Sequence, residues 1–319
     1  MTGWIVADVG GTNTRVARAL GREVLDESVR RYRNAEHPGL DSVLRAYVAE
    51  TGGAGCDGAA VAVAGPVRDE VGTLTNLDWR MDKPTLARAT GAERTAILND
   101  LQAQGHALGS IAPGCVTELV PGPEGGAQAA KLVVNVGTGF NAAPVFEASA
   151  GRLVTPSECG HANLPIRNEA ELRLCRFVET AHGFPAIEDV LSGRGLERVY
   201  AWLGHEAQDP REARAADIMR LLDEGDDRAR ETARVFVKIL GTVCGNLSLV
   251  HLPFGGVFLV GGVARAFRDH LAAYGFAEAF RDKGRFAGFM RNFRISMVED
   301  DHAALTGLAS HLTLLASKD

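Results

Sequence analysis

An apolar segment that runs directly into a glycine turn occurs three times in this chain. Short segments rich in Val, Ile and Leu that end at glycine are typical of buried strands followed by tight turns. The strands and their turns are residues 4–9 with Gly10, Gly11 and Thr12, residues 132–136 with Gly137, Thr138 and Gly139, and residues 257–260 with Gly261 and Gly262. Because the first two repeat one strand-to-turn pattern, we expect a fold that is internally duplicated.

Apolar residues at helical spacing occupy much of the sequence between these strands. They predict a helix near residues 40–48, a long core helix over residues 226–252 and a further helix over residues 264–274. The alternation of strands and helices favours an α/β protein with largely parallel, buried sheets. The length of 319 residues is sufficient for two domains of ordinary size.

Charge and composition exclude several classes of partner. The net charge is −6, the pI is near 5.9 and like charges do not form runs, so we expect neither nucleic acid nor a membrane as a partner. No segment resembles a signal peptide or an uncharged span of roughly 18 apolar residues, which favours a cytoplasmic location. The five cysteines are scattered without a C-x-x-C pair, so we expect free thiols. A small molecule is the expected partner.

The glycine turns indicate which small molecule. Two related halves with a ligand between them would direct both of the first two turns toward one cleft, where their backbone N–H groups can bind phosphate oxygens. The third turn would let a base or ribose approach the backbone closely. Each turn by itself could also serve only to reverse the chain. Asp8 ends the first strand beside these glycines, so we expect it to bind Mg²⁺ through water, with an exposed turn aspartate as the alternative.

Five segments, in this order along the chain, resemble motifs of the bacterial glucokinase family. This family belongs to the sugar kinases of the actin-like ATPase and hexokinase superfamily. The segments are residues 8–15, including Asn13, like the first phosphate motif; 98–100, like the catalytic segment; 156–161, like the sugar loop; 188–193, like the next sugar contact; and 254–262, like the adenosine segment. The resemblance extends from about residue 4 to about residue 311, nearly the whole chain.

The resemblance implies a fold and an activity. The fold would be a two-domain, ribonuclease H-like α/β fold with a cleft between internally duplicated domains. Residues 1–108, completed by a C-terminal helix over 303–319, would form the small domain, and residues 109–302 the large one. The activity would be transfer of the γ-phosphoryl group of Mg²⁺-ATP to the 6-hydroxyl of glucose, giving glucose 6-phosphate and ADP. The family also suggests a homodimer.

Individual roles follow from the same resemblance. Asp100 would accept the proton of the sugar 6-hydroxyl, although from the residues alone helix capping is the commoner role for an aspartate at this position. Hydrogen bonds to the sugar would come from Asn99, Asp100, Glu158, His161 and Glu188. ATP would contact Asp8, Gly10, Gly11, Thr12, Asn13, Gly137, Thr138, Gly139, Gly261 and Gly262. Glu158 and His161 also have the spacing of metal ligands, but no cysteine motif follows His161, so we expect no structural zinc.

One position departs from the family pattern. The family continues its second phosphate turn as Gly-Thr-Gly-Leu-Gly, whereas this chain has Phe140 and Asn141 after Gly139. We expect the Asn141 side chain either to crowd an ATP phosphate or to donate a hydrogen bond to it. Two other functions stay open: a kinase for another hexose or an amino sugar, and a sugar-binding regulatory protein with weak catalysis.

Overall fold

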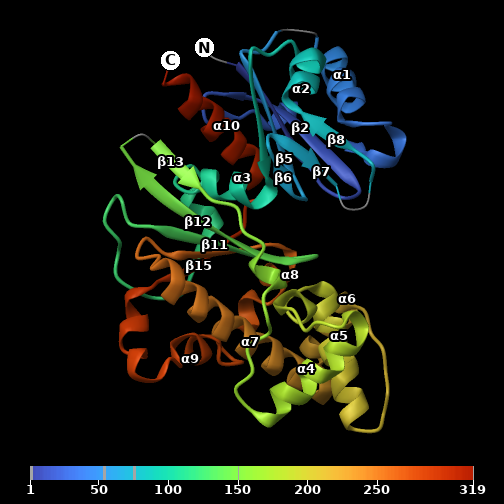
Figure 1. Cartoon of the computed structure of the whole chain (residues 1–319), viewed down its shortest axis with the longest axis vertical. Helices are drawn as coiled ribbons and strands as arrows, with labels where there is room; N and C mark the ends of the chain where they lie inside the picture. Colours follow the sequence, from blue (N-terminus) through green and yellow to red (C-terminus); the bar gives the residue numbers. More distant parts are fainter. Residues whose placement is uncertain (1–2, 53–54, 75–76, 150, 319) are drawn as a thin grey trace. The chain divides into compact units, whose positions relative to one another are not determined.

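The computed structural model describes residues 3–52, 55–74, 77–149 and 151–318 (Figure 1). The chain forms two compact units, each built from several stretches of sequence. The first unit contains Met1–Cys115, Ala148–Pro156 and Asp300–Asp319, and the second contains Val116–Glu147 and Ser157–Glu299.

The first unit is organised around a mixed sheet with the strand order β3-β2-β1-β5-β9, to which β4 adds by pairing with β2. These strands are β1 (Gly3–Val9), β2 (Asn13–Leu20), β3 (Glu23–Val24), β4 (Arg30–Arg33), β5 (Gly58–Val63) and β9 (Arg94–Asn99). β1, β5 and β9 are parallel, whereas β1 and β2 form an antiparallel hairpin. The expectation of largely parallel sheets is therefore wrong on the β2 side, because the first glycine turn simply reverses the chain.

Both faces of this sheet are covered by helices. Alternate residues of β1 enter two different cores: Ile5 packs with α1 (Leu40–Glu50) and α2 (Lys83–Thr90), and Trp4 packs with α3 (Asp100–Ala107) and α10 (Ala303–Ala316). This double burial explains why β1 is apolar at nearly every position. α10 lies so close to α3 that a Cβ at Gly307 would stand 1.7 Å from the Ala103 carbonyl oxygen.

The first unit also includes short peripheral strands. β6 (Val67–Arg68), β7 (Val71–Thr73) and β8 (Arg80–Asp82) form a small antiparallel sheet. β13 (Gly151–Val154) joins this unit through Arg152, whose guanidinium donates to the carbonyl oxygens of His106 at 2.9 Å and of Leu108.

The second unit repeats the arrangement of the first. Its sheet has the order β10-β15-β14-β11-β12-β13, in which β13 is the last strand. The other strands are β10 (Val116–Val120), β11 (Lys131–Val136), β12 (Phe140–Ala148), β14 (Val257–Val260) and β15 (Ile295–Val298). β11 and β12 are an antiparallel hairpin, and β11, β14 and β15 are parallel. Each unit thus has a glycine-turn hairpin whose first strand continues into a parallel sheet, so the predicted duplication and α/β class are confirmed.

The described part of the second unit has six helices: α4 (Glu169–His182), α5 (Gly193–Glu206), α6 (Ala215–Glu224), α7 (Asp227–His251), α8 (Gly262–Ala266) and α9 (Phe276–Arg281). α7 and α8 contact the strands of the sheet, and α5, α6 and α9 pack against α7, with α4 packing against α5. α7 is the predicted long helix. It is apolar and long enough to cross a membrane, a property that we did not expect, but its Phe236 and Leu240 are fully buried in the core of the second unit. It is a core helix.

The helix predicted over residues 264–274 is wrong in length. α8 ends at Ala266, and a 3₁₀ turn over Arg268–His270 follows. The ring of the buried Phe267 stacks on Phe236 with centroids 4.8 Å apart, and the Phe267 N–H is shared between the carbonyls of Val263 and Ala264. This tertiary contact tightens the chain at a point where periodicity alone continues a helix.

Candidate active site

The turn between β1 and β2 is held by a residue that the sequence did not single out. The Gly10 N–H donates to the Asn13 carbonyl at 3.0 Å, which closes the turn. Asn34 is 2% exposed, and it donates from Nδ2 to the Gly10 carbonyl at 2.8 Å and from its backbone N–H to the Thr12 carbonyl at 2.9 Å. Asn34 Oδ1 accepts from the buried Thr14 hydroxyl at 2.8 Å. Asn34 therefore fixes the first turn, while Gly11 and Thr12 remain exposed at its tip.

Asp8 lies in β1 opposite Arg15 of β2, shortly before this turn. Burial raises the pKa of the Asp8 carboxyl group, and the charge of Arg15 opposes that shift only in part. A carboxylate that has lost much of its hydration favours a nearby cation, since the cation restores the lost electrostatic stabilisation. The position of Asp8 therefore suits the expected Mg²⁺ ion.

Asn99 and Asp100 occupy the junction of β9 and α3. Asn99 is the N-cap of α3: its Oδ1 accepts from the Leu101 N–H at 3.0 Å, and its own N–H donates to Gln102 Oε1 at 3.1 Å. The capping role considered for Asp100 is therefore wrong, because its neighbour performs it. Asp100 is the first helical residue and is half-buried, and its Oδ1 accepts from the Leu101 N–H at 2.8 Å.

These groups of the first unit lie at one edge of its sheet. Val9 pairs with Val63, and Val63 pairs with Asn99, all in parallel strands. The carboxyl ends of β1, β5 and β9 are therefore level, and the Gly10 turn and Asp100 follow strands about 10 Å apart. This edge is where α/β sheets bind their ligands.

The turn between β11 and β12 is held by a predicted sugar-binding residue. The Gly137 N–H donates to the Gly139 carbonyl at 2.9 Å, and the Phe140 N–H donates to Glu188 Oε2 at 2.9 Å. A Cβ at Gly139 would stand 2.4 Å from the same carboxylate oxygen, so a side chain there would have to displace the Glu188 carboxylate. The structure therefore brings Glu188 into direct contact with a predicted phosphate turn. Thr138 is exposed at the tip.

The predicted sugar loop packs against the same turn. A Cβ at Gly160 would stand 2.0 Å from the Phe140 carbonyl oxygen, so the loop and the start of β12 touch through backbone atoms. His161 and Glu188 line a pocket of about 310 Å³, together with Phe184, Ala186, Asp189, Ser192, Arg194 and Arg198. Glu158 is exposed and is held by its carbonyl, which accepts from the His161 N–H at 3.1 Å. Burial raises the pKa of the Cys159 thiol, which disfavours a reactive thiolate.

The third glycine turn lies beside the second. Gly261 has φ +100°, and a Cβ there would stand 2.4 Å from the Val136 carbonyl oxygen. Gly262 faces open space, and its nitrogen is 4.0 Å from the position of a Cβ at Gly137. β11 and β14 are parallel neighbours, so their turns emerge together at the carboxyl edge of the second sheet. A nucleotide can approach the backbone closely there.

Comparison with known proteins gives one consistent result. A family model described as "Glucokinase" matches residues 5–315. The chain is 31% identical to a glucokinase of Saccharophagus degradans over 98% of both sequences. Its fold is similar to the crystal structure of a glucokinase from an Antarctic psychrotroph, with a TM-score of 0.87, 25% identity and coverage of 98% of this chain and 99% of that one. It is also similar in fold to a Balamuthia mandrillaris glucokinase solved in complex with glucose, with a TM-score of 0.79, 21% identity and coverage of 100% and 94%.

Proposed function

The chain belongs to the glucokinase family of ATP-dependent hexose kinases, and from this premise we propose how its residues transfer the γ-phosphoryl group of ATP to the 6-hydroxyl of glucose. The observation that carries the proposal is the hydrogen bond between Glu188 and the Phe140 N–H. A side chain suited to sugar hydroxyls and a turn suited to phosphates share one packed cluster, as a sugar kinase requires.

Sugar recognition is assigned to five side chains: Asn99, Asp100, Glu158, His161 and Glu188. Carboxylates accept hydrogen bonds from hydroxyls, and amide and imidazole groups both donate and accept, so this set can match a polyhydroxylated ring. Glu188 keeps Oε1 for this task, since the bond to Phe140 uses Oε2. Asn99 is partly committed already, because its Nδ2 donates to the Gly65 carbonyl at 3.1 Å. Its role would be to orient Asp100 as well as to contact the sugar.

Asp100 is proposed as the proton acceptor. As the 6-hydroxyl oxygen bonds to the γ-phosphorus, the bond to the β,γ-bridging oxygen breaks, ADP leaves, and the hydroxyl proton passes to the Asp100 carboxylate. Phosphoryl transfer depends mainly on positioning and on neutralising charge, so one well-placed base is sufficient. The Leu101 N–H donates to Oδ1 of Asp100 and so helps to orient the carboxylate that would receive the proton.

The glycine turns are proposed to bind ATP. Gly10, Gly11, Thr12 and Asn13 in the first unit, and Gly137, Thr138 and Gly139 in the second, would present backbone N–H groups to phosphate oxygens. Gly261 and Gly262 would admit the adenosine. Mg²⁺, held through water by Asp8, would neutralise phosphate charge.

A coupled ADP-release assay with Mg²⁺-ATP tests the proposal on glucose, mannose, fructose and N-acetylglucosamine. We expect the highest kcat/KM with glucose. Asp100→Asn keeps the shape of the pocket but removes the proton acceptor, so kcat should fall about 10²- to 10⁴-fold while glucose binding by calorimetry persists. A higher kcat/KM with another of these sugars would show that this sugar, and not glucose, is the preferred substrate. An Asp100→Asn variant with more than about a tenth of the wild-type kcat would refute the role of Asp100.

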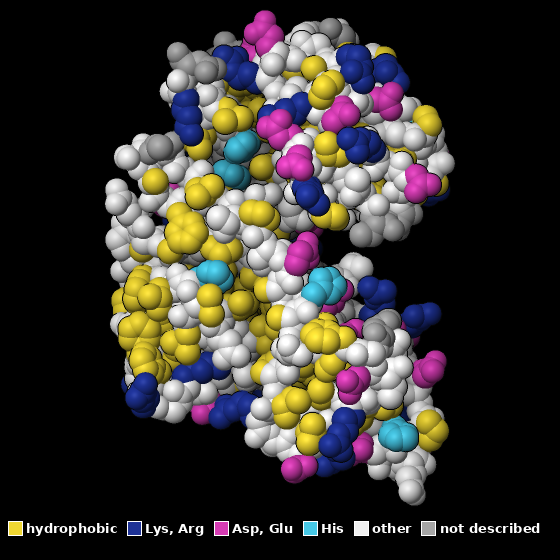
Figure 2. All heavy atoms as spheres, viewed as in Figure 1, with side chains coloured by type: hydrophobic (Ala, Val, Ile, Leu, Met, Phe, Trp, Pro, Cys, Tyr) yellow, Lys and Arg dark blue, Asp and Glu magenta, His cyan; other side chains and the backbone are white. Residues whose placement is uncertain are grey.

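We also propose a cytoplasmic homodimer. Figure 2 shows hydrophobic side chains gathered on one face of the second unit. Val250, Leu252, Phe254 and Phe286 are 72%, 41%, 38% and 44% exposed, and Phe254 stacks on Phe293 at 5.3 Å. Such an exposed apolar surface suits a second copy of the chain. Light scattering after size exclusion should give twice 33.9 kDa, and Phe286→Glu should give the monomer; a wild-type monomer would refute the proposal.

A further inference from the structure

Asn141 is the residue at which this chain departs from the glycine of the family pattern. It lies in β12, directly across from Asn135 of β11, rather than in the turn itself. A strand residue needs no glycine, so the backbone explains neither the family glycine nor its replacement. The role of Asn141 therefore depends on what its side chain contacts.

The amide of Asn141 contacts the sugar loop. Nδ2 donates to the Ser157 carbonyl oxygen. Oδ1 accepts from the Ser157 hydroxyl at 3.1 Å and from the Cys159 thiol at 3.6 Å, and it also accepts from the Ala142 N–H at 2.8 Å. Both ends of the amide are thus engaged by the loop or by the strand. These contacts direct the side chain toward the sugar loop, whereas the sequence pattern placed it near an ATP phosphate.

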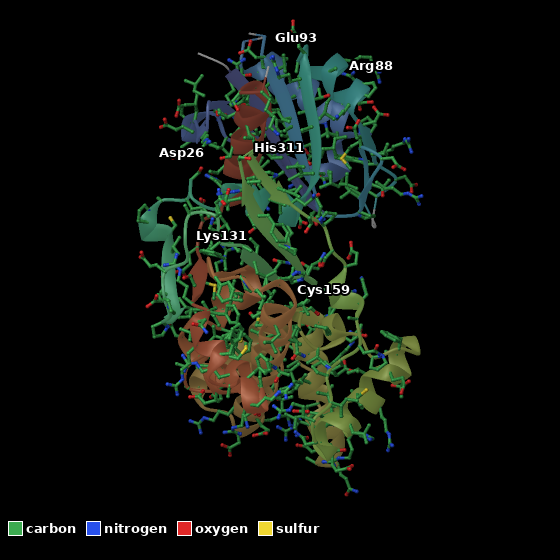
Figure 3. The ribbon with its side chains drawn as sticks, turned by 60° about the vertical axis from the view of Figure 1, so that its left-hand side comes forward. Asp26, Arg88, Glu93, Lys131, Cys159 and His311 are labelled. Atoms are coloured by element: carbon green, nitrogen blue, oxygen red, sulfur yellow. The ribbon has the colours of Figure 1, made fainter. Side chains whose placement is uncertain are left out.

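The contact reaches the residues assigned to the sugar. The Ser157 hydroxyl that donates to Asn141 also accepts from the Cys159 N–H at 3.2 Å. Glu158 lies between these two anchored residues, and its carbonyl accepts from the His161 N–H. Figure 3 labels Cys159, which marks this loop on the ribbon. The residues on both sides of Glu158 are therefore joined to one amide group, Ser157 through its carbonyl and hydroxyl and Cys159 through its thiol.

We propose that Asn141 is a positioning residue for the sugar loop, residues 157–161, and that it sets the affinity for glucose and not the affinity for ATP. The proposal rests on the proposed function in one respect only, the assignment of Glu158 and His161 to the sugar. Glycine at this position would have no side chain to make these bonds. Asn141 joins the loop to β12 with two hydrogen bonds to Ser157 and a weaker one from the Cys159 thiol.

Three variants separate this positioning role from the two roles expected toward ATP, in which Asn141 either crowds a phosphate or donates a hydrogen bond to it. Asn141→Ala removes the amide, Asn141→Asp keeps the acceptor but cannot donate to the Ser157 carbonyl, and Ser157→Ala removes the hydroxyl. Asn292→Ala is the matched control, because its Nδ2 makes a 2.8 Å bond to the Phe289 carbonyl of its own 3₁₀ turn and it has no assigned role in the site. Steady-state kinetics with glucose and ATP varied separately give both KM values.

We expect Asn141→Ala to raise the KM for glucose about 10-fold or more, with the KM for ATP unchanged within about twofold. Asn141→Asp should resemble it, because a carboxylate would face the Ser157 carbonyl. In the double variant that combines Asn141→Ala with Ser157→Ala, the loss of affinity for glucose should be much smaller than the sum of the losses in the two single variants, since both changes remove the same contact. A raised KM for ATP alone would make Asn141 a phosphate ligand, and a lowered one would show crowding; either result overturns the proposal.

A second measurement does not depend on activity. Hydrogen exchange of the sugar-free protein should show faster exchange at the Cys159 and His161 amides in Asn141→Ala, with no change in Asn292→Ala. Unchanged exchange at these amides would overturn the positioning role even if the kinetics differ. If the wild-type protein does not phosphorylate glucose but the exchange rises as expected, the positioning role stands and the proposed substrate fails.

Discussion

The two glycine-turn hairpins have the same topology but are held in different ways. Asn34, a buried neutral amide, holds the turn between β1 and β2 through the Gly10 and Thr12 carbonyls. Glu188, a half-buried carboxylate assigned to the sugar, holds the turn between β11 and β12 through the Phe140 N–H. The first support is structural only, whereas the second belongs to the site itself. Changes at the support of the second hairpin should therefore affect both sugar and ATP, whereas changes at the support of the first should affect ATP alone.

The largest difference between the hairpins should appear in stability. Gly160→Ala would place a Cβ 2.0 Å from the Phe140 carbonyl oxygen, whereas Gly10→Ala would place one 3.3 Å from the Asn13 carbonyl oxygen. The first contact forces backbone to move and should cost about 1–3 kcal/mol or more, and the second should cost much less. Thermal unfolding of both variants measures this, at roughly 2–4 °C per kcal/mol. Equal losses of Tm would show that β12 and the sugar loop are not tightly packed.

Glu188→Gln should show that the second turn and the sugar share one support. The variant keeps the shape but replaces a charged acceptor, whose hydrogen bonds are worth about 1.5–3 kcal/mol, by a neutral one. We expect kcat/KM for glucose to fall about 10- to 100-fold. The KM for ATP should also rise, because the Phe140 N–H loses its strong partner. An effect confined to glucose would separate the two functions of Glu188.

Asn34→Ala should produce a smaller and more selective effect. It leaves the Gly10 carbonyl and the Thr14 hydroxyl without their partner in a buried place, which costs about 1–3 kcal/mol of stability. The turn loosens, so the KM for ATP should rise several-fold while glucose binding measured without nucleotide stays unchanged. Calorimetry with glucose and kinetics with varied ATP check this. Weaker glucose binding would show that the first hairpin contributes to sugar binding as well as to ATP binding.

The smallest expected effect is the pH dependence of thermal stability that Asp8 causes. Its pKa is raised by burial above the ordinary value of 3.8, so its ionised form is disfavoured in the folded protein. Below pH 3.8 Asp8 is protonated in the folded and the unfolded protein, and its contribution to the stability of the fold is fully present. This contribution is lost as the pH rises through the raised pKa of the folded protein. Asp8→Asn should therefore have a higher Tm than wild type near pH 8 in the absence of Mg²⁺ and ATP, and the difference should shrink toward pH 4.

Differential scanning calorimetry across this pH range gives the test, with ATP turnover as the second readout. The variant should lose activity while gaining stability, because the same carboxylate that is poorly solvated in the free protein is the one assigned to Mg²⁺. An Asp8→Asn variant that is less stable than wild type at pH 8 would show that Arg15 fully compensates the buried charge.

Local patterns were sufficient for much of the fold. The apolar run of β1, the glycine turn after it and the repeat of both at β11 depend on short-range preferences, namely continuous burial of a strand and tight turns, and these are visible in the sequence. The long helix α7 follows in the same way from apolar spacing. The family resemblance added the order of the motifs, and with it the residues assigned to sugar and ATP.

Only the tertiary structure could decide which neighbour performs which task. Asn99 and Asp100 are both good helix caps by type, and the extended backbone of Asn99, with ψ 151°, is what makes it the cap and leaves Asp100 for chemistry. The sequence alone determined the strands and the turns, because each depends on a few adjacent side chains, and its resemblance to the family supplied the candidate polar residues. The supports of the two turns and the partner of Asn141 join residues 16 to 48 positions apart, and such contacts depend on packing that no local pattern encodes.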